Sequence, residues 1–140
     1  MGSLSIGDLS RKAGVKVPTI RFYEEIGLLP PPARTASNRR VYDAEAVKRL
    51  SFIRHARELG FEVEAIRALL RLSSEPQAPC AEADRIARRH LAEVEDRIAR
   101  LTALRAELER MVAECGHGRV CDCRVIEVLA DHRLCHHDHH

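Results

Sequence analysis

The sequence predicts a mainly α-helical protein, with a winged helix-turn-helix domain, one long helix and a C-terminal loop rich in cysteine and histidine. Three observations predict this fold class. Of the 140 residues, 45% are hydrophobic and 31% charged but only 4% aromatic, which is typical of exposed helices. Gly and Pro divide residues 1–80 into short segments, whereas residues 82–113 contain neither. All five cysteines lie in the second half of the chain.

Two short helices are predicted at the N-terminus. Ser5 and Asp8 form a capping box that opens the first helix, and Gly14 ends it. Pro18 suits the first turn of a second helix, TIRFYEEIGLL, which runs to Gly27. As a helix-turn-helix, the pair would present four side chains of the second helix to DNA: Lys16, Thr19, Arg21 and Tyr23. A helical hairpin without a DNA-binding role is the alternative.

The segment PPPARTASNRRVYD predicts a wing. Three prolines end the preceding helix, Ser37 and Asn38 favour a turn, and the flanking residues alternate as in a short hairpin. Such a hairpin would direct its side chains towards DNA phosphates. The predicted contacts are Arg34, Arg39, Arg40 and Tyr42, supported by Arg54 of the next helix. The alternative is a solvated basic loop.

Two amphipathic helices complete this domain, which we place at residues 1–72. Asp43 caps the first helix, whose apolar stripe includes Leu50 and Ile53, and Gly60 ends it. The second helix follows in residues 61–72. The domain carries 13 Lys/Arg against 8 Asp/Glu, whereas residues 73–140 carry 10 against 13. The N-terminal half is therefore the expected nucleic-acid face.

A hinge with two prolines and two serines is predicted at residues 73–81, followed by a dimerisation helix at residues 82–113. Apolar side chains recur along this helix at steps of three and four, with Ile98 and Leu101 at the centre. A helix of this length cannot cover such a seam alone, so we expect a second copy of the chain to supply a partner helix. The alternative is packing against its own N-terminal domain only.

Residues 114–130 are predicted to form a metal-binding loop and a short helix. Thiolate and imidazole ligands suit zinc, cadmium, lead, mercury or copper(I), whereas calcium and magnesium require carboxylates. Four such ligands lie within nine positions, at a spacing that matches no zinc finger: Cys115, His117, Cys121 and Cys123. The tail, residues 131–140, adds Cys135 and five histidines. It is either a second, weaker metal store or a disordered or artificially added end.

Taken together, these residues resemble the MerR family of metal-responsive transcription regulators. The likeness rests on TIRFYEEIGLL, the wing with Asn38, Arg40 and Tyr42, RLSFIRHARELGF, the long helix, and Cys115 and Cys123 around a loop that precedes VIEVL. It implies a homodimer joined by an antiparallel coiled coil, with a metal loop at each end, bound to double-stranded promoter DNA. On binding metal, such a dimer distorts a promoter whose spacer is too long, so that RNA polymerase can use it.

The resemblance also implies a metal site. The resemblance implies that the copper(I) branch of the family has a serine at the head of the long helix. Here the residue at that position is Cys80, as in the zinc, cadmium, lead and mercury branches. Cys80 of one subunit, with Cys115 and Cys123 of the other, would hold a divalent ion, completed by His117 or Cys121. We expect Zn²⁺ or Cd²⁺, with Pb²⁺, Hg²⁺ and Cu⁺ as alternatives.

The resemblance to the zinc branch is incomplete at Glu114. Regulators of that branch carry a second cysteine, adjacent to the first, at this position. The seven-residue gap between Cys115 and Cys123 instead resembles the copper branch. A copper(I)-responsive regulator is therefore the alternative reading of this site.

An enzyme and a metal-storage protein are the two other function classes that such a sequence allows. An enzyme would need an open metal position and a base in a concave pocket, and Glu114 is expected to be a solvated helix residue instead, so we expect no catalysis. A metal-storage protein would use the tail and leave the basic half solvated. No apolar run approaches the roughly 20 residues of a membrane span, and the N-terminus lacks a signal-peptide pattern. We therefore expect a cytoplasmic protein with no membrane partner.

Overall fold

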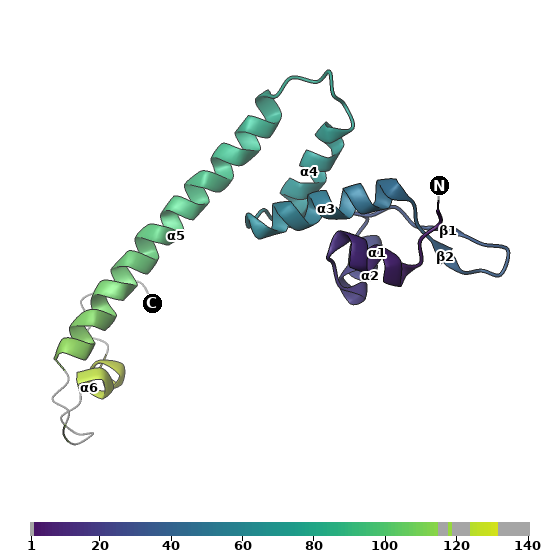
Figure 1. Cartoon of the computed structure of the whole chain (residues 1–140). Coiled ribbons are helices and arrows are strands. Elements are labelled where there is room, and N and C mark those ends of the chain that lie inside the picture. The colour runs from purple at the N-terminus through teal and green to yellow at the C-terminus, as the bar shows by residue number, and fades with distance from the viewer. Residues whose placement is uncertain (1, 115–117, 119–123, 132–140) are drawn as a thin grey trace. The chain divides into compact units, whose positions relative to one another are not determined.

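The computed structural model describes residues 2–114, 118 and 124–131. The elements in chain order are α1 (Ile6–Ala13), α2 (Val17–Glu25), β1 (Ala33–Arg34), β2 (Arg40–Val41), α3 (Ala44–Glu58), α4 (Val63–Ser73), α5 (Ala81–Ala113) and α6 (Arg124–Ala130) (Figure 1). In its described part the chain is helical apart from one two-stranded hairpin, which confirms the predicted fold class. It divides into two compact units, Met1–Ile86 and Ala87–His140.

The predicted helix-turn-helix is present in the first unit. Ser5 Oγ accepts a hydrogen bond from the Asp8 amide at 3.1 Å, and the Asp8 carboxylate accepts one from the Ser5 amide at 3.4 Å, so the capping box is closed. Gly14 ends α1 with φ 69°, a left-handed conformation that favours glycine. The buried Val15 follows, and α2 then begins with Pro18 in its first turn.

The predicted wing is also present. β1 and β2 pair antiparallel, with Ala33 opposite Val41 and Arg34 opposite Arg40. Asn38 makes the turn with φ 64°, and its amide donates to the Thr35 carbonyl at 2.9 Å. At the base of the hairpin, the backbones of Leu4 and Tyr42 exchange two hydrogen bonds of 2.9 and 2.8 Å. The wing is therefore attached to the residues that precede α1.

The core of the first unit lies where its helices meet the base of the wing. Asp43 begins α3 by accepting a hydrogen bond from the Ala46 amide at 3.1 Å, and Gly60 follows its end with φ 85°. Burying each large aliphatic side chain contributes about 1.5–3 kcal/mol. The largest fully buried side chains are Leu9, Ile20, Leu28, Leu29, Leu50, Ile53 and Ile66.

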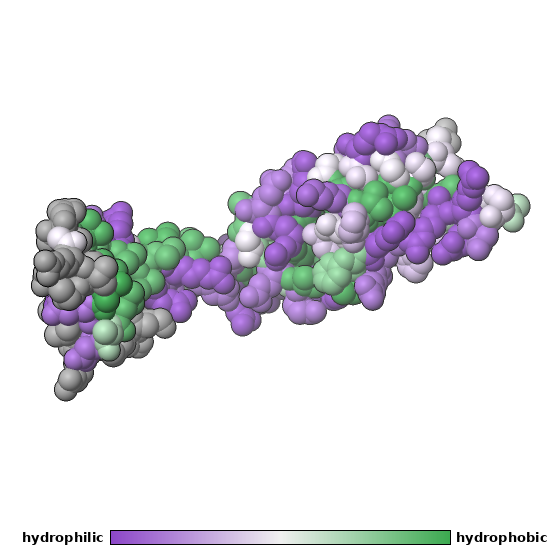
Figure 2. Space-filling view, turned by 90° about the horizontal axis from the view of Figure 1, so that it is seen from below, coloured by the Kyte–Doolittle hydropathy of each residue, from purple (hydrophilic) through white to green (hydrophobic). Residues whose placement is uncertain are grey.

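The long helix α5 begins one residue before the predicted boundary and ends at the predicted Ala113. Within the described residues of this single chain, its apolar seam is largely exposed. Leu91, Ile98, Leu101, Leu108 and Val112 have exposed fractions between 56% and 65%. In Figure 2, hydrophobic surface, drawn in green, is visible along the narrow part of the molecule formed by α5.

The short helix predicted within residues 114–130 is α6, at Arg124–Ala130. It belongs to the second unit, where Met111 of α5 and Val128 of α6 are buried. Among the described residues, no helix combines the length and apolarity that crossing a membrane would require.

Candidate nucleic-acid interface and metal ligands

The beginning of α2 borders a hollow of ≈ 360 Å³. Lys16, just before α2, lines it together with Thr19 and Tyr23 of α2 and Arg54 of α3. The fold therefore brings together four of the residues predicted to bind DNA, although Arg54 lies 31 positions or more from the other three in the chain. A positive charge at the exposed start of a recognition helix can reach a phosphate or a base edge.

Arg54 lies over the turn between α1 and α2. A Cβ atom at position 14 would collide with Arg54 Nη1, and the backbone of Gly14 already has positive φ. The left-handed conformation is what favours glycine at this position, because the end of the flexible Arg54 side chain can shift away from a Cβ atom. The buried Arg54 Nε has no hydrogen-bond partner among the described residues and lies 3.7 Å from Glu58 Oε1.

Glu24 connects α2 to the wing. Arg40 Nη1 donates to Glu24 Oε1 at 2.6 Å, and the Tyr42 hydroxyl donates to Glu24 Oε2 at 2.5 Å. The side chain of Glu24 is only 10% exposed, so both bonds are largely shielded from water. Charge-assisted bonds of this kind are stronger than neutral ones. One carboxylate thus fixes two wing residues relative to α2.

The structure corrects the expectation that Tyr42 contacts a phosphate. Tyr42 is 5% exposed and belongs to the core, because burying its ring removes a large apolar area from water. Burial raises the pKa of the Tyr42 phenol by disfavouring the phenolate, and the hydrogen bond to Glu24 raises it further. The phenol is therefore a neutral donor that supports Glu24.

Tyr23 is mostly buried as well. It is 8% exposed and lies one helical turn from the fully buried Ile20, so most of its ring packs in the core, while the residue also lines the hollow beside Lys16, Thr19 and Arg54. The aromatic residue that α2 exposes is the neighbouring Phe22. The spacing of Ile20 and Tyr23 in the sequence is itself a signal that both are buried.

The remaining predicted cations lie on the surface of α2 and the wing. Lys16, Arg21, Arg34 and Arg39 are exposed. Arg21, Arg34 and Arg40 line a second hollow of ≈ 400 Å³, to which Glu24 and Glu25 also contribute. Arginines from α2, β1 and β2 therefore converge on one surface, as phosphate binding requires.

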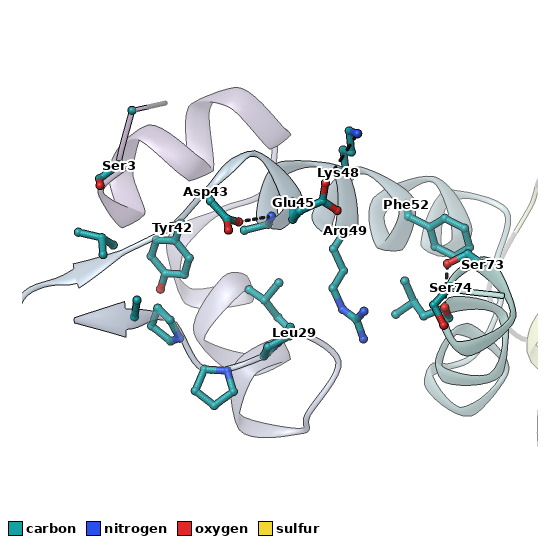
Figure 3. A pocket seen from close by; sticks show the side chains of 18 residues that line it. Ser3, Leu29, Tyr42, Asp43, Glu45, Lys48, Arg49, Phe52, Ser73 and Ser74 are labelled. Atoms are coloured by element: carbon teal, nitrogen blue, oxygen red, sulfur yellow. Dashed lines mark hydrogen bonds and ion pairs between the residues drawn. The ribbon is translucent and has the colours of Figure 1, made fainter. Parts of the chain in front are cut away.

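Two arginines that sequence reasoning missed support the end of α2. Arg49 Nε of α3 donates to the Leu28 carbonyl at 2.6 Å, and Arg67 Nη2 of α4 donates to the Ile26 carbonyl at 2.9 Å. Both carbonyls lie just past α2, where backbone acceptors lack helical partners and where positive charge is favoured. Figure 3 shows Arg49 reaching from α3 into a hollow of ≈ 780 Å³ beside Leu29.

Of the predicted metal ligands, Cys80 is the one that the structure describes. Its thiol is free and exposed, and its carbonyl accepts the first helical hydrogen bond of α5 from the Asp84 amide at 2.9 Å. Arg71 Nη2, near the end of α4, donates to Glu82 Oε1 at 2.9 Å. This exposed ion pair connects the first turn of α5 to α4, in the same compact unit as Cys80.

The other predicted ligands lie outside the described residues: Cys115, His117, Cys121 and Cys123. Within the described part of the chain, no three or more His, Cys, Asp or Glu side chains are grouped to hold a metal ion. The thiolate chemistry of Cys80 suits a soft or borderline ion, but one thiol needs further ligands.

Two protein-family models match this chain. A model described as "MerR HTH family regulatory protein" covers residues 4–73, and one described as "MerR, DNA binding" covers residues 47–111. Together they span the helix-turn-helix, the wing and nearly all of α5.

Individual relatives agree with these models. The HTH-type transcriptional regulator HmrR of Sinorhizobium medicae is 41% identical over 128 residues, which cover 91% of this chain and 86% of the relative. Heavy metal-dependent transcription regulator 2 of Rhizobium meliloti is 37% identical over 128 residues, which cover 91% of this chain and 87% of the relative. The crystal structure of the transcription regulator PbrR691 from Ralstonia metallidurans in complex with lead(II) matches with a TM-score of 0.80 and 37% identity, over 90% of this chain and 98% of that one. All three are named as transcription regulators and not as enzymes.

Proposed function

The chain belongs to the MerR family of helix-turn-helix regulatory proteins, and from that premise we propose that it is a metal-sensing transcription regulator. It binds a promoter as a homodimer and activates transcription when a divalent soft or borderline ion binds. The observation that carries this proposal is the free thiol of Cys80 at the start of α5, a helix whose apolar seam is exposed. A heavy metal-dependent relative and a relative crystallised with lead(II) support the metal response.

The homodimer follows from the seam of α5. Five large aliphatic side chains are more than half exposed along one helix, which is costly in water for a single chain. A second copy of the same helix presents the same spacing of apolar residues and therefore covers the seam along its whole length. We propose an antiparallel arrangement, which sets the two DNA-binding units apart for two half-sites of double-stranded DNA.

Each DNA-binding unit places α2 against the DNA bases and the wing against the sugar–phosphate backbone of the DNA. Lys16, Thr19 and Arg21 are assigned to the recognition surface. The wing arginines Arg34, Arg39 and Arg40 bind phosphates, and Arg54 adds a phosphate contact beside the start of α2. Tyr23 and Tyr42 are assigned packing roles because both are buried.

Metal binding is assigned to both subunits. Cys80 of one protomer acts with Cys115 and Cys123 of its partner, and His117 or Cys121 completes the set. Three thiolates supply the charge and the coordination that Zn²⁺ or Cd²⁺ favours, and Pb²⁺ and Hg²⁺ suit the same donors. An effector shifts a conformational equilibrium only through different affinities for the two states. Ligands from two chains provide that difference, because their separation changes when the subunits move.

The conformational change acts through DNA. The promoter has a spacer that is too long between the two elements that RNA polymerase recognises. The metal-bound dimer distorts this DNA, so that RNA polymerase can then use the promoter. A copper(I)-responsive regulator of the same family is the second candidate, favoured by the seven-residue gap between Cys115 and Cys123. A metal-storage protein is a weaker third candidate.

The test is promoter-linked transcription with Zn²⁺, Cd²⁺, Pb²⁺, Hg²⁺ and Cu⁺, using wild type and Cys80→Ser. The variant is expected to lose the response to divalent ions while its metal-free DNA binding stays intact, and to keep or improve any response to Cu⁺. Cys135→Ser is the matched control, with a much smaller effect. Full induction of Cys80→Ser by zinc or cadmium would contradict the intersubunit site.

A further inference from the structure

Glu24 places a carboxylate on the surface where the arginines of α2 and the wing converge. It lines the hollow of ≈ 400 Å³ together with three arginines assigned to DNA: Arg21, Arg34 and Arg40. The exposed Glu25 lines the same hollow. Both carboxylates repel a DNA phosphate at this place, because like charges oppose each other. Simple electrostatics therefore predicts that DNA affinity rises when either carboxylate is removed.

The contacts of Glu24 indicate a different role. Arg40 Nη1 donates to Glu24 Oε1 at 2.6 Å and the Tyr42 hydroxyl donates to Glu24 Oε2 at 2.5 Å, so wing residues use both oxygens. The side chain of Glu24 is 10% exposed, whereas that of Arg40 is 37% exposed. A guanidinium has five N–H donors in a fixed plane. Arg40 can therefore bind Glu24 through Nη1 and present its exposed side to a phosphate.

The wing needs support from the rest of the unit. β1 and β2 have two residues each, and so short a two-stranded hairpin is not stable by itself in water. The backbone bonds between Leu4 and Tyr42 attach the base of the wing to the residues before α1. The two bonds to Glu24 attach it to α2. These side-chain bonds are therefore what joins the wing directly to the recognition helix.

We propose that Glu24 is a positioning residue for DNA binding. It holds Arg40 against α2, so that the recognition helix and the wing meet the DNA as one preorganised surface. A guanidinium that is already ordered loses less conformational entropy when a phosphate binds it. Glu24 therefore raises DNA affinity although its own charge opposes DNA. This inference rests on the proposed function, because it assumes that α2 and the wing bind DNA.

The experiment measures the affinity of the full-length protein for duplex DNA by fluorescence anisotropy in about 50 mM salt. The probe is a duplex of mixed sequence, about 40 base pairs long, which spans two half-sites. No operator is needed, because phosphate contacts do not depend on sequence.

Glu24→Gln preserves the size of the side chain but leaves one neutral oxygen where the wing uses two charged ones. We expect DNA binding to weaken by about threefold for each DNA-binding unit, and hence by about tenfold for a dimer with both units bound. The salt dependence of binding should also flatten, because a misplaced Arg40 neutralises its phosphate less completely.

Two variants separate positioning from charge. Glu25→Gln removes the neighbouring carboxylate of the same hollow and should strengthen binding, by up to about twofold. Glu24→Asp keeps the charge but shortens the side chain by one methylene, so that it cannot reach both wing donors at their present distances. It should weaken DNA binding, whereas electrostatics alone predicts no change.

The effect of Glu24→Gln should change sign in the Arg40→Ala background. Without the guanidinium, Glu24 has no phosphate-binding group to position and only repels DNA. Glu24→Gln should therefore strengthen binding in Arg40→Ala, although it weakens binding in wild type. Such a reversal within a double-mutant cycle measures the coupling between the two residues.

Urea denaturation of each variant shows whether it is folded under the conditions of the DNA assay. A folded variant that binds DNA less tightly has lost positioning and not its fold, and Glu24→Asp provides the same test if Glu24→Gln does not fold. Tighter binding by Glu24→Gln than by wild type, or the same effect from Glu24→Gln and Glu25→Gln, would overturn the positioning role. A wild-type protein that does not bind duplex DNA would instead overturn the proposed function itself.

Discussion

The N-terminal unit and α5 bury their apolar side chains in different ways. In the N-terminal unit, stripes from four helices meet, and Leu9, Leu50 and Ile66 are fully buried within one chain. Along α5 the same kind of stripe, centred on Ile98 and Leu101, is more than half exposed. The difference teaches that the N-terminal unit buries its apolar stripes within one chain, whereas α5 keeps an apolar face that the described residues leave exposed, as the proposed partner helix requires.

The largest expected effect comes from Ile98→Asp combined with Leu101→Asp. Two carboxylates in the seam should prevent dimerisation, and DNA affinity should fall by at least about a hundredfold because two linked half-site contacts become one. Sedimentation measures the oligomeric state, and a gel shift with the cognate promoter measures binding. The N-terminal unit should keep its fold, since neither residue belongs to its core. A wild-type protein that sediments as a monomer at micromolar concentration would contradict the proposed dimerisation through α5.

A smaller effect is expected from Tyr42→Phe, which acts inside the N-terminal unit. The substitution removes the 2.5 Å hydrogen bond to Glu24 and should lower the free energy of unfolding by about 1.5–3 kcal/mol, the usual range for a bond to a charged group. Urea denaturation at pH 7 measures this loss. Dimer formation through α5 should be unchanged, so a shift in the monomer–dimer equilibrium would argue against independent regions.

The effect of Tyr42→Phe on the free energy of unfolding should depend on pH. The pKa of the Tyr42 phenol is raised in the folded state, first by burial and then by Glu24. The stabilisation is therefore fully present below the unfolded pKa of about 10 and is lost as pH rises through the higher folded value. The difference in unfolding free energy between wild type and Tyr42→Phe should shrink above about pH 10. A difference that grows in this range would contradict the assigned hydrogen bond.

The smallest effect concerns Arg40→Ala. Loss of one phosphate contact should weaken binding to all DNA sequences alike and flatten the salt dependence by about one unit. The substitution also leaves the shielded carboxylate of Glu24 without its cation. The loss of DNA affinity should therefore exceed that caused by Arg34→Ala, which removes an exposed arginine of the wing. Adding Glu24→Gln to Arg40→Ala should recover part of the difference. A change in base preference alone would show that Arg40 does not bind phosphate.

Local signals in the sequence predicted most of the elements. Ser5 and Asp43 begin helices, Gly14 ends one, and Asn38 makes the wing turn, because each depends on residues only a few positions away. The absence of Gly and Pro between residues 82 and 113 predicted the length of α5 to within one residue. For the metal ligands, the sequence placed Cys80 at the head of α5, as observed, and the other ligands stay predictions.

Contacts between distant residues could not be predicted in the same way. Tyr23 and Tyr42 were expected at the DNA surface, but each ring is buried, since a large aromatic gains more from the core than from solvent. Nothing in the sequence marked Glu24, which binds two wing residues 16 and 18 positions away. Glu114 is exposed, as expected, and its pairing with Arg124 is a contact that local sequence signals do not indicate.

The sequence by itself determined the helices, the turns, the basic half and the exposed seam of α5, because these depend on backbone preferences and on periodicity over a few turns. Only the tertiary structure decided which charges are free to meet DNA and which are held inside the protein. Arg49 and Arg67 illustrate this, because they donate to carbonyls 21 and 41 positions away. The physical reason is that burial and pairing of a charge depend on what folding places beside it, and a guanidinium has the same sequence signature in either role.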